Sequence, residues 1–238
     1  MRQFSEKDRR LTITIRGNIY HTYLNIYSYI IGDNMLKKCL FPNIDGKMPK
    51  LGKNIYIDQN SVIIGDVIIE DGVYISPNAV IRCDEPPTKG IIIKKNVNIQ
   101  DGAVIHCLSG TGVIVGKDSS ISHCTIIHGH AEIGDKSFIG FNSIVFNAEI
   151  GDNVVIGHNC VIDGTGDTIK IPNNKWIPPN SSIYKDEDGI LKAFLSNGKI
   201  ITNFTELPEL PGWYKSFPDK VANINNTLNQ GYINIYKK

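Results

Sequence analysis

The chain has 238 residues and a formal net charge of +1, and 40 of its residues are isoleucine while only 11 are leucine. Isoleucine is β-branched and fits a pleated strand better than a helix, so this composition excludes an all-α bundle. The nearly balanced charge excludes a strong attraction to nucleic acid or to an anionic membrane, and we expect neither as a partner.

The first 50 residues form an N-terminal segment whose structure the sequence does not indicate. Residues 1–34 match nothing that follows, and Met35 could be an alternative start. The charged beginning MRQFSEKDRR and the interrupted run from Leu11 to Ile31 fit neither a signal peptide nor a membrane span. The five cysteines include no CxxC pair, which favours reduced thiols. We therefore expect a soluble, cytoplasmic protein.

From about residue 55 onwards, an aliphatic residue recurs every six positions. This period is typical of a left-handed parallel β-helix, in which three short strands form one triangular coil and each strand points one aliphatic side chain inward. We therefore predict an all-β fold, with a left-handed parallel β-helix of hexapeptide repeats over residues 51–184. The alternative, a β-sandwich, would show turn signals about every 8–12 residues. The repeated positions are Ile69, Ile75, Ile81, Ile93, Ile99, Ile105, Val115, Ile121, Ile127, Ile133, Ile139, Val145, Ile150, Ile156 and Ile162.

Interruptions of the six-residue spacing locate loops. Twelve residues separate Ile81 from Ile93, which predicts that a loop around DEPPTKG leaves one corner of the helix. Ten residues separate Ile105 from Val115, which predicts a smaller bulge near SGTG. The interval from residue 145 to residue 150 is one residue short.

A C-terminal extension follows over residues 185–238, and we expect it to contain one helix. Residues 216–230 have the signals of a helix, with Ser216 as N-cap and Gly231 just past the end. Three apolar residues on one face are expected to pack against a coil wall. They are Val221, Ile224 and Leu228.

The repeat places three polar residues in one column. Every third unit lies on the same face, so Arg82, His106 and His128 should stack outward, with about 4.8 Å between neighbours. Two imidazoles at that separation can reach one metal ion with metal–nitrogen bonds of about 2.0–2.1 Å.

His123 falls on the adjacent face of the same coil as His128, so it cannot reach that ion within one chain. Only the His123 of a neighbouring chain could be the third ligand. Repeated head to tail, this contact closes a homotrimer with three interfacial metal sites. The alternative is that these histidines are separate surface residues, which is what we expect for the other three. Those are His21, His130 and His158.

Three segments of the chain resemble the γ-class carbonic anhydrases. They are IRCDE (81–85), NIQDGAVIH (98–106) and SHCTIIHGHAEIGDKSFIGFNSIVFNAEIGDN (122–153). They are similar both to the archaeal enzymes and to the γ-carbonic-anhydrase domain of the carboxysome scaffold protein, and the resemblance covers about residues 50–183. It implies reversible hydration of CO2 to bicarbonate by a hydroxide on zinc, with iron or cobalt as other fitting metals. His106 and His128 of one subunit and His123 of the partner subunit would be the ligands.

The resemblance also implies roles for five further residues. Gln100 would orient the water or hydroxide, Glu85 would take part in proton removal, and Asn225 would lie near the substrate. Arg82 and Asp84 would form an intersubunit salt bridge that supports the trimer.

One departure from the family pattern leaves other functions open. The loop after His106 is only CLSGTG and has no carboxylate for proton export, and we hypothesise that His130 shuttles protons instead. A γ-carbonic-anhydrase-like scaffold or assembly protein with weak or no activity is one alternative. A hexapeptide acyltransferase, with an acyl-CoA substrate and a histidine as general base, is another.

Overall fold

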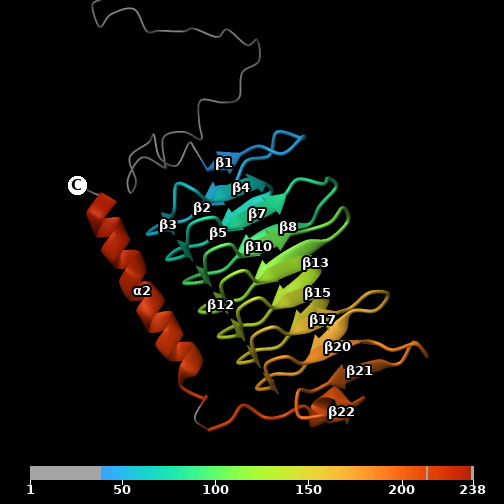
Figure 1. The fold of residues 1–238 in the computed structure, drawn as a ribbon. Helices are drawn as coiled ribbons and strands as arrows, with labels where there is room; N and C mark the ends of the chain where they lie inside the picture. Colours follow the sequence, from blue (N-terminus) through green and yellow to red (C-terminus); the bar gives the residue numbers. More distant parts are fainter. Residues whose placement is uncertain (1–38, 213, 237–238) are drawn as a thin grey trace, which may run out of the picture.

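The described chain forms a parallel β-helix with one helix lying along its side (Figure 1). The computed structural model describes residues 39–212 and 214–236, so the expectations for residues 1–34, Met35 and His21 lie outside it. No helix in the described ranges combines the length and the apolar character that crossing a membrane requires.

Three faces make up the β-helix, and each coil contributes one short strand to each face in turn. Strands of the first face are β1 (Leu40–Phe41), β4 (Val62–Gly65), β7 (Val80–Cys83), β10 (Val104–His106), β17 (Val161–Asp163) and β20 (Ser182–Lys185). Strands of the second face are β2 (Lys50–Leu51), β5 (Val67–Ile69), β8 (Gly90–Ile93), β11 (Gly112–Val115) and β18 (Ile169–Ile171). The strands β13 (Ile126–Ile133) and β15 (Ile144–Ile150) run around the corner and belong to both faces.

The third face is a separate seven-stranded sheet, and the C-terminal elements follow it in the chain. Its strands are β3 (Tyr56–Ile57), β6 (Tyr74–Ile75), β9 (Asn98–Ile99), β12 (Ser120–Ile121), β14 (Phe138–Ile139), β16 (Val155–Ile156) and β19 (Trp176–Ile177). The C-terminal elements are β21 (Leu191–Phe194), β22 (Ile200–Ile201), the short 3-10 helix η1 (Phe204–Glu206) and α2 (Phe217–Tyr236).

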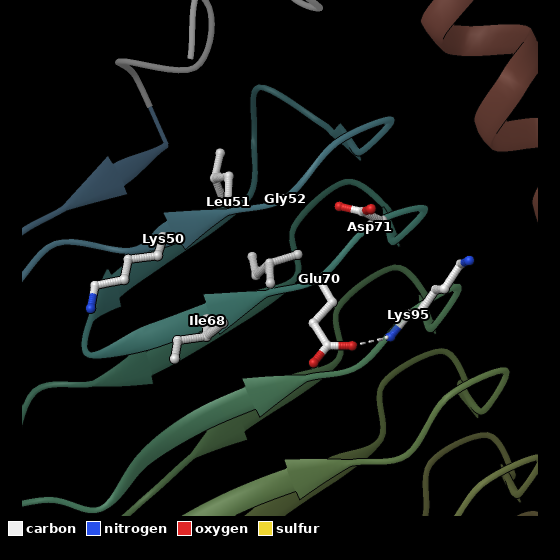
Figure 2. A pocket seen from close by; sticks show the side chains of 8 residues that line it. Lys50, Leu51, Gly52, Ile68, Glu70, Asp71 and Lys95 are labelled. Atoms are coloured by element: carbon white, nitrogen blue, oxygen red, sulfur yellow. Dashed lines mark hydrogen bonds between the residues drawn. The ribbon is translucent and has the colours of Figure 1, made fainter. Parts of the chain in front are cut away.

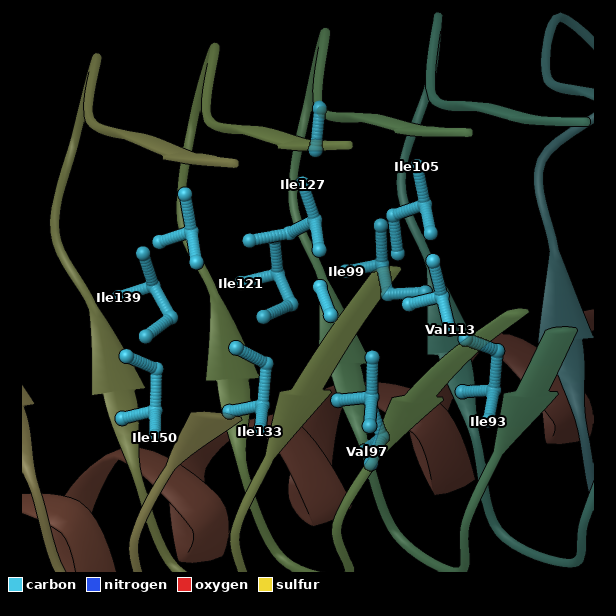
Figure 3. Packing of buried hydrophobic residues seen from close by; sticks show 14 of the residues in the cluster. Ile93, Val97, Ile99, Ile105, Val113, Ile121, Ile127, Ile133, Ile139 and Ile150 are labelled. Atoms are coloured by element: carbon cyan, nitrogen blue, oxygen red, sulfur yellow. The ribbon is translucent and has the colours of Figure 1, made fainter. Parts of the chain in front are cut away.

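Ladders of isoleucine and valine fill the interior (Figure 3). On the first face Ile81, Ile105 and Ile127 are register partners on successive coils, and each is fully buried. Ile99 and Ile121 pair in the same way on the third face. Each such burial stabilises the fold by about 1.5–3 kcal/mol, so the six-residue period that defines the coils also supplies their stability.

Both predicted loops are confirmed. Residues 84–89 separate β7 from β8, and residues 107–111 separate β10 from β11. The interval from residue 145 to residue 150, which is one residue short, also has a structural counterpart. The register between β13 and β15 shifts after His128, because β15 turns the corner with one residue fewer. Asn147 makes that turn with φ of 49°, a left-handed conformation that asparagine tolerates.

The stack of strands begins before residue 51. β1 pairs with β4 and β2 pairs with β5, both parallel, so residues 40–51 add strands to the first and second faces. At the other end β20 is the last parallel strand, and β21 and β22 extend the sheet in antiparallel fashion.

The C-terminal helix is longer than predicted. It begins at Phe217, directly after Ser216, but it continues through Gly231 to Tyr236. The reason is a tertiary contact beyond the glycine. The ring of Tyr232 stacks on that of Tyr56 with centroids 4.6 Å apart, and Ile233 is buried against the third face. This packing overrides the weak helix propensity of a single glycine.

The face of α2 that meets the coils is polar at its centre, so the predicted apolar contact is wrong for Ile224 and Leu228, while Val221 is half-buried. Ile224 and Leu228 are 61% and 41% exposed, whereas Asn225 and Asn229 are buried. The amide of Asn229 donates hydrogen bonds to the carbonyl oxygens of Asn54 and Gly72, at 2.9 and 3.0 Å. The coil turns present backbone carbonyls to the helix, and asparagine satisfies them where an aliphatic side chain could not.

Candidate metal centre

The predicted first-face column is confirmed. Arg82, His106 and His128 occupy register positions on β7, β10 and β13. Nδ1 of His106 lies 2.9 Å from Nε2 of His128, and the two rings meet at 67°. Because the strands are parallel and in register, residues 22 positions apart in the chain come into contact.

Two carboxylates border the other side of the His106 ring. Nε2 of His106 lies 3.3 Å from Oε1 of Glu85 and 3.6 Å from Oδ1 of Asp84. Both carboxylates belong to the loop 84–89, which leaves the corner directly after β7. Nε of Arg82 donates to Oδ1 of Asp84 at 3.0 Å, so these two residues already pair within one chain.

The surroundings of His128 favour its neutral form, which is the form that binds a metal. Burial lowers its pKa, and the neighbouring His106 lowers it further. The ring of Phe146, the register partner on β15, covers it with centroids 5.6 Å apart. Nδ1 of His128 and Nε2 of His106 are buried and make no hydrogen bond, although the carboxylates of Glu85 and Asp84 lie near Nε2 of His106, so both rings have unused polar capacity.

The donor set of one chain fits a metal only in part. His106 Nδ1 and His128 Nε2 face one another as two ligands of a common ion would, and zinc accepts imidazole nitrogen readily. A protein zinc site needs three or four protein ligands, however. Within the described ranges of one chain, no group of three or more His, Cys, Asp or Glu residues is arranged to hold an ion.

His123 lies at the corner that follows β12 on the third face, not in the column. Its Nδ1 is 2.9 Å from Oδ2 of Asp101, and its side chain is 46% exposed. The ring of Phe141 covers it from the next coil, with centroids 5.1 Å apart. With Nδ1 engaged by Asp101, the exposed Nε2 is the nitrogen available to another molecule.

Gln100 and Asn225 meet under the C-terminal helix. Nε2 of Gln100 donates to Oδ1 of Asn98 at 2.6 Å and to Oδ1 of Asn225 at 3.4 Å. Its Oε1 accepts from the hydroxyl of Ser76 at 3.4 Å, and Asn225 donates to the hydroxyl of Ser120 at 3.5 Å. The Gln100 amide is therefore fixed in one orientation, and it precedes Asp101 in the chain.

The predicted site thus divides into two half-sites on different faces. The column half-site contains Arg82, Asp84, Glu85, His106 and His128. The corner half-site contains Gln100, Asp101, His123 and Asn225. The sequence analysis missed Asp101, although its place after Ile99 matches that of His123 after Ile121, and this register signal could have identified it.

The remaining described histidines have other partners. His130 Nε2 lies 3.7 Å from Oε1 of Glu149, which is also paired with Lys170 at 2.8 Å. His158 stacks on Phe141 with ring centroids 4.3 Å apart. The proton-shuttle role of His130 stays a hypothesis.

A separate, open pocket lies on the second face near the start of the β-helix (Figure 2). Its wall carries the apolar side chains of Leu51 and Ile68 beside Lys50 and Glu70. Oε2 of Glu70 accepts from the backbone amide of Lys95 at 3.0 Å. The pocket contains none of the predicted site residues.

Comparison with known sequences places the repeat among hexapeptide proteins. Residues 48–83 match the family model for the bacterial transferase hexapeptide (six repeats). The carboxysome assembly protein CcmM of Nostoc sp. is 33% identical over 197 residues, which are 77% of this chain and 31% of that protein. The carnitine operon protein CaiE of Escherichia coli O157:H7 is 37% identical over 101 residues, which are 42% of this chain and 50% of that protein. The matches therefore span about a third and half of these relatives.

Two solved structures share the fold. A hexapeptide transferase family protein from Anaplasma phagocytophilum superposes with a TM-score of 0.63 at 22% identity, over 82% of this chain and 99% of that one. A putative acetyltransferase from Bacillus cereus gives 0.52 at 24% identity, over 83% and 98%. At this identity the likeness establishes the left-handed β-helix and nothing about activity.

Proposed function

We propose that the two half-sites meet between subunits and that the protein acts as a zinc-dependent carbonic anhydrase. The observation that carries the proposal is the 2.9 Å approach of His106 Nδ1 to His128 Nε2. Two imidazole nitrogens on one tetrahedral zinc lie about 3.3 Å apart, so a small rotation of either ring makes room for the ion.

The surface around the half-sites supports a contact between copies of the chain. Beside the histidine column runs a second outward column of β-branched residues, in which Ile126 and Ile144 are each 36% exposed. At the corner half-site Phe141 is 45% exposed next to His123. A heterologous contact that covers both patches would close into a homotrimer and bring the partner subunit's His123 to the column.

In that assembly, each half-site has a defined task. His106, His128 and the partner subunit's His123 would hold zinc, and iron or cobalt fits the same three imidazoles. Zinc held by these residues would lower the pKa of water, so that hydroxide is available for the attack on CO2. Gln100, whose amide is held by Asn98 and Asn225, would orient that water from the corner half-site.

Glu85 is the residue best placed to remove the proton. Its Oε1 lies 3.3 Å from His106, and its side chain is 43% exposed, so it connects the buried column with solvent. Arg82 holds the neighbouring Asp84 at 3.0 Å and thereby fixes the start of the loop that carries Glu85. The loop 107–111 has no carboxylate, so Glu85, external buffer and the hypothesised shuttle His130 are the candidate proton acceptors.

Acyl transfer from an acyl-CoA is the second candidate, and one observation favours it. The approach of Glu85 and Asp84 to His106 Nε2 also describes a carboxylate–histidine pair suited to general-base catalysis on a hydroxyl or amine. A third candidate is an assembly protein that retains the fold and the metal with weak or no activity.

One set of measurements separates the three candidates. Zinc-loaded protein should be trimeric, contain one metal per chain and hydrate CO2, and His123→Ala should lose metal and activity together. Ile200→Ala, at an exposed residue outside both half-sites, is the control and should keep both. A metal-free protein that transfers acetyl groups from acetyl-CoA would establish the second candidate instead. A metal-loaded trimer without hydration would establish the third.

A further inference from the structure

Cys83 and Cys107 form a pair of buried thiols behind the histidine column. They follow Arg82 and His106, which are register partners on β7 and β10. Both cysteines are fully buried, and Sγ of Cys107 lies 2.9 Å from Sγ of Cys83. Neither has a role in the proposed hydration reaction.

The spacing of the two strands is compatible with a disulfide between the thiols. Adjacent strands of a sheet lie about 4.8 Å apart. This separation falls within the range of about 4.4–6.8 Å that Cα atoms span in disulfides. A bond between Cys83 and Cys107 is therefore within reach of side-chain rotation, since the sulfurs already lie 2.9 Å apart. A metal is a poorer occupant, since no third ligand joins the pair in the described part of the chain.

The loop 84–89 begins directly after Cys83 and lies next to its sulfur. Cys83 is the last residue of β7, and the hydroxyl of Thr88, near the end of that loop, lies 3.1 Å from its sulfur. Asp84 and Glu85 at the start of the loop have side chains that are 22% and 43% exposed. Opening of this half-exposed loop would admit a molecule as small as hydrogen peroxide to Cys83.

We propose that Cys83 and Cys107 are a redox pair that hydrogen peroxide oxidises to a disulfide. The Cys83 sulfur attacks one peroxide oxygen, the O–O bond breaks, and the thiol proton leaves with the other oxygen as water. Cys107 then attacks the sulfenic sulfur of Cys83. The S–S bond forms, the S–O bond breaks, and the departing hydroxyl takes the Cys107 proton as a second water.

This balance needs one peroxide per pair and no other co-reactant. The two thiols give up two electrons, the peroxide becomes two waters, and a dithiol reductant reverses the reaction. The bond would tie the coil of Arg82 to that of His106. It would also fix the first residues of the loop that carries Asp84 and Glu85. Oxidation would therefore restrain the part of the column half-site that these two carboxylates form.

The test is a peptide map of the metal-free wild-type protein, which does not depend on the proposed hydration activity. After peroxide treatment, alkylation under denaturing conditions and trypsin digestion, residues 83–89 and 96–117 should appear as one cross-linked species. Dithiothreitol should restore two separate peptides. Cys160→Ser, which removes another buried thiol, should leave the cross-link intact, and Cys83→Ser should abolish it.

Three outcomes would overturn the proposal. One is alkylation of both thiols after peroxide treatment, another is sulfinic acid at Cys83 without a cross-link, and the last is a cross-link to the exposed Cys124. The wild-type map gives one of these results or the expected one even if a serine variant fails to fold.

Discussion

The rings of His106 and His128 meet edge to face, with centroids 4.8 Å apart and the facing nitrogens separated by 2.9 Å. Local sequence does not create this pair, since the two histidines are 22 positions apart in the chain. It is created by the coil period, which stacks β10 on β13 in register. Two facing nitrogen lone pairs require either a shared proton or a cation between them.

Asp101 should act as a positioning residue for His123. Its Oδ2 lies 2.9 Å from Nδ1 of the imidazole, so Nε2 is the ring nitrogen that faces away from this carboxylate. The variant Asp101→Asn should weaken zinc affinity about 10- to 100-fold, as loss of such partners does in other zinc sites. Competition with a chromophoric chelator measures this. Glu132→Gln, an exposed acid on the second face, is the control, and equal affinities in both variants would remove Asp101 from the site.

The core ladders should dominate stability. Ile105→Ala removes a fully buried side chain between two register partners and should lower the free energy of unfolding by about 2–5 kcal/mol. Ile200 is 58% exposed, and Ile200→Ala should change the free energy by less than about 0.5 kcal/mol. Urea denaturation of both variants measures the difference. Similar losses in the two variants would contradict the ladder description.

Gly231→Ala tests whether α2 continues past residue 230. A Cβ at this position would meet no other atom within 4 Å, and the helical backbone suits alanine. The substitution should therefore raise the free energy of unfolding by about 0.5–1 kcal/mol. Thermal and urea denaturation followed by circular dichroism report it.

The matched control for that variant is Gly72→Ala. Gly72 has φ of +76°, and a Cβ there would lie 2.3 Å from Oδ1 of Asn96, so the control should destabilise the protein. Destabilisation by Gly231→Ala as well would mean that the glycine ends the helix.

The period of the aliphatic residues was sufficient to predict the fold and the register of the first-face column. Counting units from Ile81 through Ile105 to Ile127 places Arg82, His106 and His128 together, because each coil repeats the same three directions. Local propensity failed at α2. Gly231 indicated where an isolated helix would end, and the apolar pattern indicated which side it would bury. Neither signal contains the backbone carbonyls of the coils, with which Asn229 forms hydrogen bonds.

The contact between Gln100 and Asn225 was also beyond sequence periodicity. It joins residues 125 positions apart through the docking of α2 on the third face, and no repeat relates the helix to the coils. Only the resemblance to a family indicated both residues. Asp101, by contrast, follows the repeat and was accessible to register counting.

Mixed trimers test the central claim most directly, because the claim is that each metal centre takes its ligands from two chains. His106→Ala destroys the column half-site and His123→Ala destroys the corner half-site, so each variant alone should bind almost no zinc. Refolded together in equal amounts, the two variants should recover about one quarter of the wild-type zinc, since one interface in four pairs two intact half-sites. Full zinc binding by His123→Ala alone, or no recovery in the mixture while wild type binds zinc, would contradict a shared site.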